Sequence, residues 1–159
     1  MRTALLLALL AAPLAGPTLA ACQGDEAFSC QIGTKTLEVC YWKGMLTYAY
    51  GPEDDPEIFL NERLETVAFT PWPGIGSSLW ETVAFENAGY TYEVWTSVER
   101  DPEATEPRAG GVRVLQGDQT VAELECDGGT ATSMDGLYDL KDGIGQCWDM
   151  DAHAWGSCG

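Results

Sequence analysis

The sequence has few basic side chains. Its 159 residues hold 8 Lys and Arg against 25 Asp and Glu, which gives a formal net charge of −17, and the chain has a single histidine. Nucleic acids and anionic lipid surfaces are recognised through clustered Lys and Arg. We therefore expect no nucleic-acid partner. At 45% hydrophobic and 10% aromatic residues, the chain is still rich enough to fold around a core.

Catalytic motifs are also missing. The sequence has no G-x-S-x-G, H-E-x-x-H, phosphate-loop or dinucleotide-binding pattern. His153 is the one imidazole, so any mechanism with a histidine base would have to use it. Carboxylates are abundant, but no particular pair stands out as a hydrolase pair. We predict a protein that is not an enzyme and uses no cofactor.

Long apolar runs are absent after the N-terminus. Arg2 precedes a short apolar run over residues 4–14, and Thr18-Leu19-Ala20 resembles a signal-peptidase cleavage site. The run is too short to cross a bilayer. We predict a signal peptide at 1–20 and one exported domain at 21–159, periplasmic or secreted and without a transmembrane segment. Loss of Arg2 would bring the net charge to −18.

The cysteines bear on how the exported chain is held. Leu19-Ala20-Ala21-Cys22 resembles a bacterial lipobox, in which Cys22 would be lipidated and anchored to the outer membrane. The chain has six cysteines: Cys22, Cys30, Cys40, Cys126, Cys147 and Cys158. Lipidation of Cys22 would leave an odd number in an oxidising compartment. We favour a soluble protein with three disulfides and keep the lipoprotein as the alternative.

Spacing alone does not fix the disulfide pairing. Two short strands at 28–32 and 36–40 would bring Cys30 and Cys40 together, which favours a local bridge. Cys147 and Cys158 enclose a segment without helix or strand period, so a bridge there could hold the tail against the domain. Paired C-x-x-C or Cys/His spacings are missing, which favours disulfides over zinc.

Short strands separated by turn residues dominate the pattern. Residues 36–42 and 45–50 flank a Lys43-Gly44 turn, and a helix is expected over 134–144 with Ser133 or Asp135 as its cap. Further strands are expected at 58–60, 66–69, 111–115 and 120–126. The predicted fold is mainly β: an antiparallel meander of seven or eight short strands forming a small barrel or sandwich, with one short C-terminal helix.

The clearest hairpin joins residues 79–86 to 90–98. We expect a three-residue turn, Asn87-Ala88-Gly89, in which the glycine takes the left-handed conformation. With that register Trp80 and Trp95 lie on opposite faces. Both faces then carry aromatics, which predicts a sheet covered on both sides and both tryptophans in the core.

Few residues stand out as ligands. Asp149, Asp151 and His153 alternate along the tail and are weak candidates for a metal site, although a solvated acidic tail is the simpler interpretation. Trp72, between two prolines, and Trp155 are candidates for partner binding. The alternative is that these two aromatics fold back as lids over the core.

Several segments together resemble known exported proteins. They are 28–30, 35–39, 48–50, the aromatic hairpin through 89–95, and the closing strand 121–126. Their order resembles uncharacterised exported proteobacterial β-rich proteins and, distantly, the periplasmic inhibitors of C-type lysozyme, which are small β-barrels. Those inhibitors reach into the lysozyme cleft with a Ser-Gly motif followed by Tyr, and with a downstream Lys. Here Leu79 follows Ser77-Ser78, so the inhibitory residues do not carry over.

Two classes of function remain. The first is a non-enzymatic protein-binding module, inhibitor-like, whose acidic surface would attract a basic protein. The second is a structural or small-ligand-sequestering exported domain with no protein target, whose acidity serves solubility. Salt should weaken association in the first case only.

Overall fold

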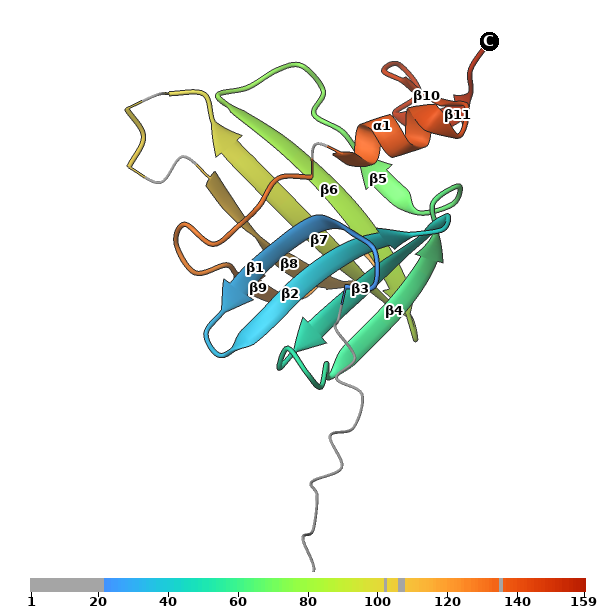
Figure 1. The fold of residues 1–159 in the computed structure, drawn as a ribbon. Helices are drawn as coiled ribbons and strands as arrows, with labels where there is room; N and C mark the ends of the chain where they lie inside the picture. Colours follow the sequence, from blue (N-terminus) through green and yellow to red (C-terminus); the bar gives the residue numbers. More distant parts are fainter. Residues whose placement is uncertain (1–21, 102, 106–107, 135) are drawn as a thin grey trace, which may run out of the picture.

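The computed structural model describes residues 22–101, 103–105, 108–134 and 136–159. The predicted signal peptide and Asp135 lie outside these residues. The chain forms two antiparallel sheets and a small C-terminal unit (Figure 1). No helix among the described residues is both long and apolar enough to span a membrane.

Each strand pairs with its neighbour in sequence, so both large sheets are meanders. Sheet A contains β1 (Asp25–Ile32), β2 (Lys35–Trp42), β3 (Met45–Gly51) and β4 (Ile58–Arg63). Sheet B contains β5 (Ala68–Thr70), β6 (Ser78–Asn87), β7 (Tyr90–Glu99), β8 (Arg108–Gln116) and β9 (Gln119–Glu125). The predicted mainly β, antiparallel class is confirmed, and of the two predicted architectures the sandwich fits.

The core lies between the two sheets. Sheet A passes over sheet B with its strands crossing those beneath (Figure 1). Alternate side chains point inward, as the two-residue period of a strand requires. The Tyr48 ring lies 5.6 Å from that of Phe85 and 5.7 Å from that of Tyr92. The fully buried side chains come from both sheets and include Phe28, Leu37, Val39, Leu46, Val83, Val94 and Val112.

Three disulfides close the structure, as predicted. Cys30–Cys126 links β1 to the end of β9 across the sandwich, and Cys22–Cys40 ties the N-terminal segment to β2. Cys147–Cys158 closes the tail, which confirms the bridge expected there. The prediction of a local Cys30–Cys40 bridge was wrong. Cys30 pairs with Leu37 on the core side of β2, whereas Cys40 lies on the opposite face of that strand.

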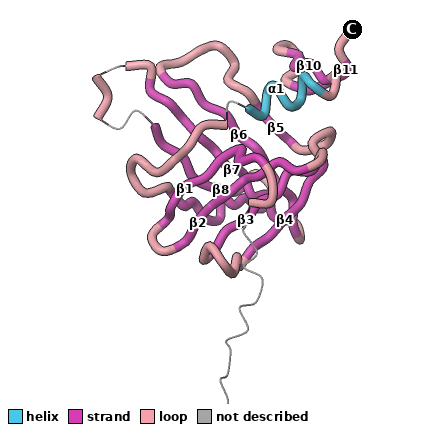
Figure 2. Tube along the Cα trace, viewed as in Figure 1, coloured by secondary structure: helices cyan, strands magenta, loops and turns pink. Residues whose placement is uncertain are grey.

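The C-terminal unit contains α1 (Gly136–Gly143), β10 (Gln146–Asp149) and β11 (Ala154–Ser157) (Figure 2). The predicted helix is confirmed but is shorter, and Ser133 lies too far upstream to cap it. The tail, expected to be irregular, is a hairpin, so the described residues form eleven strands rather than seven or eight.

The register of the β6–β7 hairpin differs from the prediction by one residue. Asn87 pairs with Tyr90, which leaves a two-residue turn of Ala88 and Gly89. Both turn residues have positive φ, +51° and +82°, as the type I′ turn requires. A slip of one residue moves side chains to the other face of a sheet.

The two tryptophans of this hairpin are therefore not core residues. Trp95 pairs with Thr82, and Trp80 pairs with Ser97. Both indoles lie on the outer face of sheet B, where they are only partly buried and line cavities. The prediction that both faces of this sheet are covered was wrong. It rested on the register that a three-residue turn would impose.

Candidate functional site

A groove opens on the outer face of sheet A. Its cavity of about 510 Å³ runs over β2, β3 and β4 and reaches the loop between β3 and β4. The residues that line this groove are Gln23, Cys40, Trp42, Met45, Thr47, Asp54, Asp55, Pro56, Phe59 and Asn61. It therefore combines aromatic and apolar side chains with two carboxylates.

Strand register places the large apolar side chains of the groove on one face of sheet A. Trp42 pairs with Met45 across β2 and β3, and Ala49 pairs with Phe59 across β3 and β4. Trp42 is 48% exposed and Phe59 is 50% exposed. Large apolar side chains that gather on a surface and stay in water mark an interaction site more often than scattered ones do.

The Cys22–Cys40 disulfide forms part of the groove wall. Cys40 lies on the outer face of β2, and the bridge holds the chain at Cys22 and Gln23 against that face. Cys40 is itself 2% exposed. The N-terminal segment is thereby fixed beside the apolar side chains rather than left loose.

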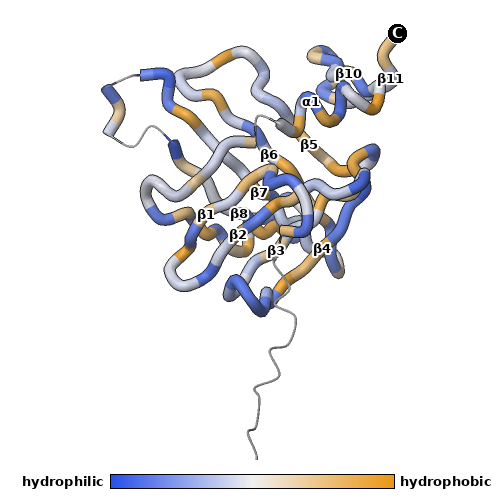
Figure 3. Tube along the Cα trace, viewed as in Figure 1, coloured by the Kyte–Doolittle hydropathy of each residue, from blue (hydrophilic) through white to orange (hydrophobic). Residues whose placement is uncertain are grey.

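The loop between β3 and β4 gives the groove an acidic rim. Asp54 and Asp55 are exposed and line the cavity, and this loop is strongly hydrophilic in Figure 3. The Glu57 N–H donates to the carbonyl of Tyr50 at 2.9 Å, which folds the loop back onto β3. Gly51, at φ +148°, lets Glu57 approach, because a Cβ there would collide with the Glu57 backbone. The backbone of the loop that carries the two aspartates is thus folded against β3.

A further carboxylate lies on the same face of sheet A. Glu38 pairs with Ala49, and its Oε2 is buried without a hydrogen-bond partner among the described residues. Burial raises the pKa of Glu38, and the neighbouring Glu26 and Glu53 raise it further. This face therefore carries a concentration of negative charge.

One cation already contacts an aromatic ring of the groove. The Lys43 ammonium lies 4.8 Å from the centre of the Trp42 ring. A cation over an indole face is a favourable arrangement, because the ring carries negative charge on its faces. The groove therefore contains a cation–aromatic contact beside its apolar side chains.

The two candidate anchor tryptophans lie elsewhere. The Trp155 ring packs against the rings of Phe69, Tyr138 and Trp148, with 5.2–5.8 Å between ring centres. Its Nε1 donates to the Phe69 carbonyl at 2.7 Å. Trp72 donates to the carbonyl of Ile75 at 2.9 Å. Both are partly buried by contacts within the chain, and their role as partner anchors stays a prediction.

The candidate metal ligands of the tail are engaged in a turn. The Asp149 carboxylate accepts the N–H groups of Asp151 and Ala152 at 2.8 and 2.9 Å. These bonds, that of Ala152 first, hold the pKa of Asp149 below its usual value. His153 closes the turn at φ +52°. A metal role for Asp149, Asp151 and His153 stays a prediction.

The structure also brings together one set of residues whose potential metal-ligand atoms lie within 4.8 Å of one another. Within the described part of the chain, Asp142, Cys147 and Cys158 are the only such group. Both cysteines are used by the disulfide, which leaves a single carboxylate. This group therefore does not form a metal site.

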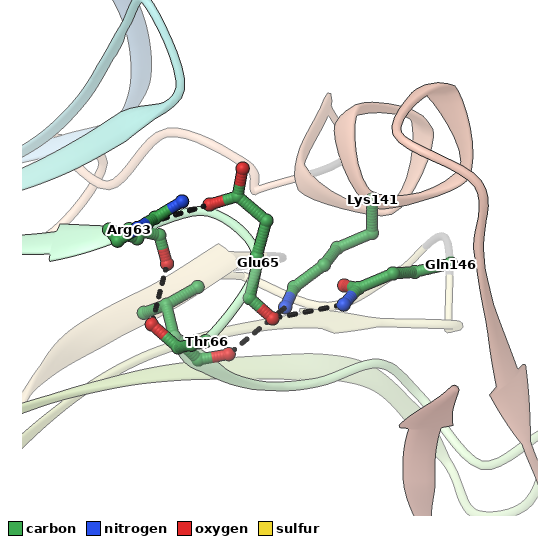
Figure 4. Close-up of polar contacts among 6 residues, drawn as sticks. Arg63, Glu65, Thr66, Lys141 and Gln146 are labelled. Atoms are coloured by element: carbon green, nitrogen blue, oxygen red, sulfur yellow. Dashed lines mark hydrogen bonds and ion pairs between the residues drawn. The ribbon is translucent and has the colours of Figure 1, made fainter. Parts of the chain in front are cut away.

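A buried lysine was not found from the sequence. Lys141 of α1 is 1% exposed, and its ammonium donates to the carbonyl of Val67 at 3.1 Å and to that of Glu65 at 3.5 Å. Gln146 donates to the same Glu65 carbonyl at 2.9 Å (Figure 4). Burial lowers the pKa of Lys141, and Glu65 partly opposes this. Its spacing of four from Leu137 is the signal that could have placed it on the inward face of α1.

Known proteins offer no guide to the groove. No family model matches the chain, and neither the curated proteins nor the solved structures include a significant match. Its function must be inferred from the side chains that it presents.

Proposed function

We propose that the protein is a non-enzymatic protein-binding module, periplasmic or secreted, that holds a basic and apolar segment of a partner protein in the groove of sheet A. The observation that supports this most is the exposure of Trp42 and Phe59 in the same groove as the exposed carboxylates of Asp54 and Asp55. Aromatic anchors at the centre of an interface and charges at its rim are the usual arrangement in protein recognition.

The charge of the chain favours a basic partner. A net charge of −17 attracts a cationic protein over long range and raises its association rate. Lys43 is exposed, so a partner's lysine or arginine could replace its ammonium over the Trp42 ring. A basic exported hydrolase such as a lysozyme fits this description, and it fits the distant resemblance to the inhibitors of C-type lysozyme.

The disulfides support an oxidising compartment outside the cytoplasm. The pairing of Cys22 with Cys40 favours the soluble form over the outer-membrane lipoprotein. Lipidation of Cys22 would leave the Cys40 thiol unpaired in the groove wall. In the proposed soluble form, Cys22 and Cys40 form the disulfide that is part of the groove wall.

Binding of a basic protein to the immobilised chain tests the proposal. C-type lysozyme serves as the probe, with Trp42→Ala, Phe59→Ala and Asp54→Asn/Asp55→Asn as variants. Ile75→Ala is the matched control, because Ile75 is 73% exposed and does not line the groove. We expect the Trp42 and Phe59 variants to speed dissociation about tenfold or more, and the Asn pair to slow association at low salt only.

The outcomes separate specific from merely electrostatic binding. Lysozyme that binds every variant equally would show attraction to the net charge alone and would overturn the groove. Loss of binding in Ile75→Ala as well would overturn it too. Absence of binding to several basic exported proteins would remove the proposed partner class.

The volume of the groove supports one alternative. Cavities of roughly 300–1,000 Å³ are typical of small-molecule sites, and the groove has about 510 Å³. Sequestration of an apolar small ligand would predict that an environment-sensitive dye binds at the groove, is lost in Phe59→Ala, and is insensitive to salt.

A further inference from the structure

The outer face of sheet B carries a second hollow that the proposed function does not use. Two adjoining cavities of about 250 and 430 Å³ lie over β6, β7 and β8 and share Trp80, Thr82 and Arg113 as lining residues. Trp95 lines the first cavity, and Glu93 the second. We call these five residues the indole hollow.

Strand pairing builds the indole hollow from neighbouring positions. Thr82 of β6 pairs with Trp95 of β7, and Glu93 of β7 pairs with Arg113 of β8. On the other side of Trp95 stands Gly111, which has no side chain to cover the indole. The residues therefore share one face of three adjacent strands, with aromatic and polar groups interleaved.

The arginine of the hollow is fixed in place. The Arg113 guanidinium lies 5.1 Å from the centre of the Trp95 ring, and it pairs with Glu93 at 3.1 Å and with Glu123 at 2.9 Å. A guanidinium has five N–H donors. These ion pairs use two of them, so others stay available to a ligand. A planar group held by two carboxylates and an aromatic ring loses little freedom when a ligand binds.

The chemistry of the hollow excludes several ligand classes. Glu93 and Glu123 more than balance the charge of Arg113, so an anion gains little there. Arg113 lies over the Trp95 ring and two ion pairs hold it there, so another cation cannot take its place on that ring. The two tryptophans are recessed rather than prominent, which differs from the exposed Trp42 and Phe59 that suit a protein partner.

A neutral sugar presents groups that complement those of the indole hollow. A pyranose ring presents an apolar face of C–H groups, which can stack on an indole, and a rim of hydroxyls that both donate and accept hydrogen bonds. Arg113 would donate to such hydroxyls, Glu93 would accept from them, and the Thr82 hydroxyl can do either. A site with an apolar platform and a few placed polar groups is the usual form of small-ligand recognition.

We infer that the indole hollow on the outer face of sheet B binds a neutral pyranose oligosaccharide, with Trp80 as its stacking platform and Arg113, Glu93 and Thr82 as its hydrogen-bonding groups. This site lies on the opposite side of the sandwich from the groove. It depends on different residues, and because the ligand is neutral, its affinity is nearly independent of salt. The test of this site is therefore independent of the test of the proposed function.

Titration with defined oligosaccharides tests the inference. Cellohexaose, chitohexaose and mannohexaose are added separately to the mature protein, and the indole N–H signals are followed by two-dimensional NMR. We expect at least one probe to saturate below ~10 mM, Trp80→Ala to weaken it about tenfold or more, and Thr82→Val to weaken it less. Trp42→Ala is the matched control, because it removes an indole from the other sheet and should leave sugar binding unchanged.

Each outcome of the titration decides for or against the site. Trp80→Phe, which keeps a smaller ring, should retain part of the affinity and covers the case in which Trp80→Ala does not fold. Saturation with equal loss in Trp42→Ala would place the sugar elsewhere and overturn the site. Binding of these neutral probes that disappears as NaCl is raised would show that it does not depend on stacking and hydroxyl contacts, and would also overturn the site. No shift with any of the three probes would do the same.

Discussion

Removal of the Cys30–Cys126 disulfide should destabilise the protein more than removal of either other bridge. This bridge spans 96 residues of sequence and links the two sheets, whereas Cys22–Cys40 spans 18 and Cys147–Cys158 spans 11. A disulfide stabilises largely by restricting the unfolded chain, and the restriction grows with the loop that it closes.

The loop lengths give the size of the effect. With the chain-entropy relation, the bridges contribute about 4.7, 3.2 and 2.8 kcal/mol at 25 °C, in the order Cys30–Cys126, Cys22–Cys40, Cys147–Cys158. Alanine is the suitable replacement because Cys30 is 2% exposed, and a serine hydroxyl there would be buried without a partner. The cavity left by the sulfur adds to the loss for Cys30–Cys126.

Urea unfolding of the double variants measures the difference. Cys30→Ala/Cys126→Ala should lose roughly 2 kcal/mol more than Cys147→Ala/Cys158→Ala, which at an m-value of ~1–3 kcal/mol/M separates the midpoints by roughly 0.6–2 M. The tail variant is the control, because it also removes one bridge but leaves the sandwich intact. Equal midpoints at equal m-values would refute the ranking by loop length.

Four further substitutions have defined signs. The raised pKa of Glu38 means that the folded state holds its proton at pH values where the unfolded state has lost it, so stability falls as pH rises above about 4.5; Glu38→Gln should flatten this decline in urea unfolding between acid and neutral pH. Lys141→Ala should lower the free energy of unfolding by about 2–4 kcal/mol, because it empties a buried site and leaves the Val67 carbonyl without its donor. Ala88→Asn should raise it by ~0.5–1 kcal/mol and Gly89→Ala should lower it by about 1 kcal/mol, since both positions are left-handed; thermal unfolding that moves both in one direction would contradict the two-residue turn.

Local signals in the sequence were sufficient for most strands and for the helix. The Lys43-Gly44 turn joins two strands as predicted, and the strands expected at 111–115 and 120–126 also pair, because a tight hairpin depends on a few adjacent residues. The tail hairpin was missed, since four-residue strands are too short to show a period. The Cys30–Cys126 bridge could not be found, because its partners meet only when the two sheets are stacked.

The groove could not be predicted from the sequence, for a similar reason. Its aromatics, Trp42 and Phe59, come from strands that are not adjacent, and their exposure depends on which face of sheet A is covered. The position of the acidic loop over the strands depends on the conformation of Gly51 and on the hydrogen bond from the Glu57 N–H to the Tyr50 carbonyl. Charge and hydropathy therefore indicated a partner class, while the location of the groove required the three-dimensional structure.

Register decides what each sheet presents to solvent. In a strand, neighbouring residues point to opposite faces, so the one-residue difference at Ala88 exchanges core and surface along β7. With the two-residue turn, Val94 enters the core and Trp95 joins Trp80 outside, and the sandwich gains a second aromatic face. The outer faces then differ in kind: sheet A joins exposed aromatics to unbalanced carboxylates, while sheet B joins recessed indoles to a neutralised arginine. Salt should separate them, because only the first face depends on net charge for its ligand.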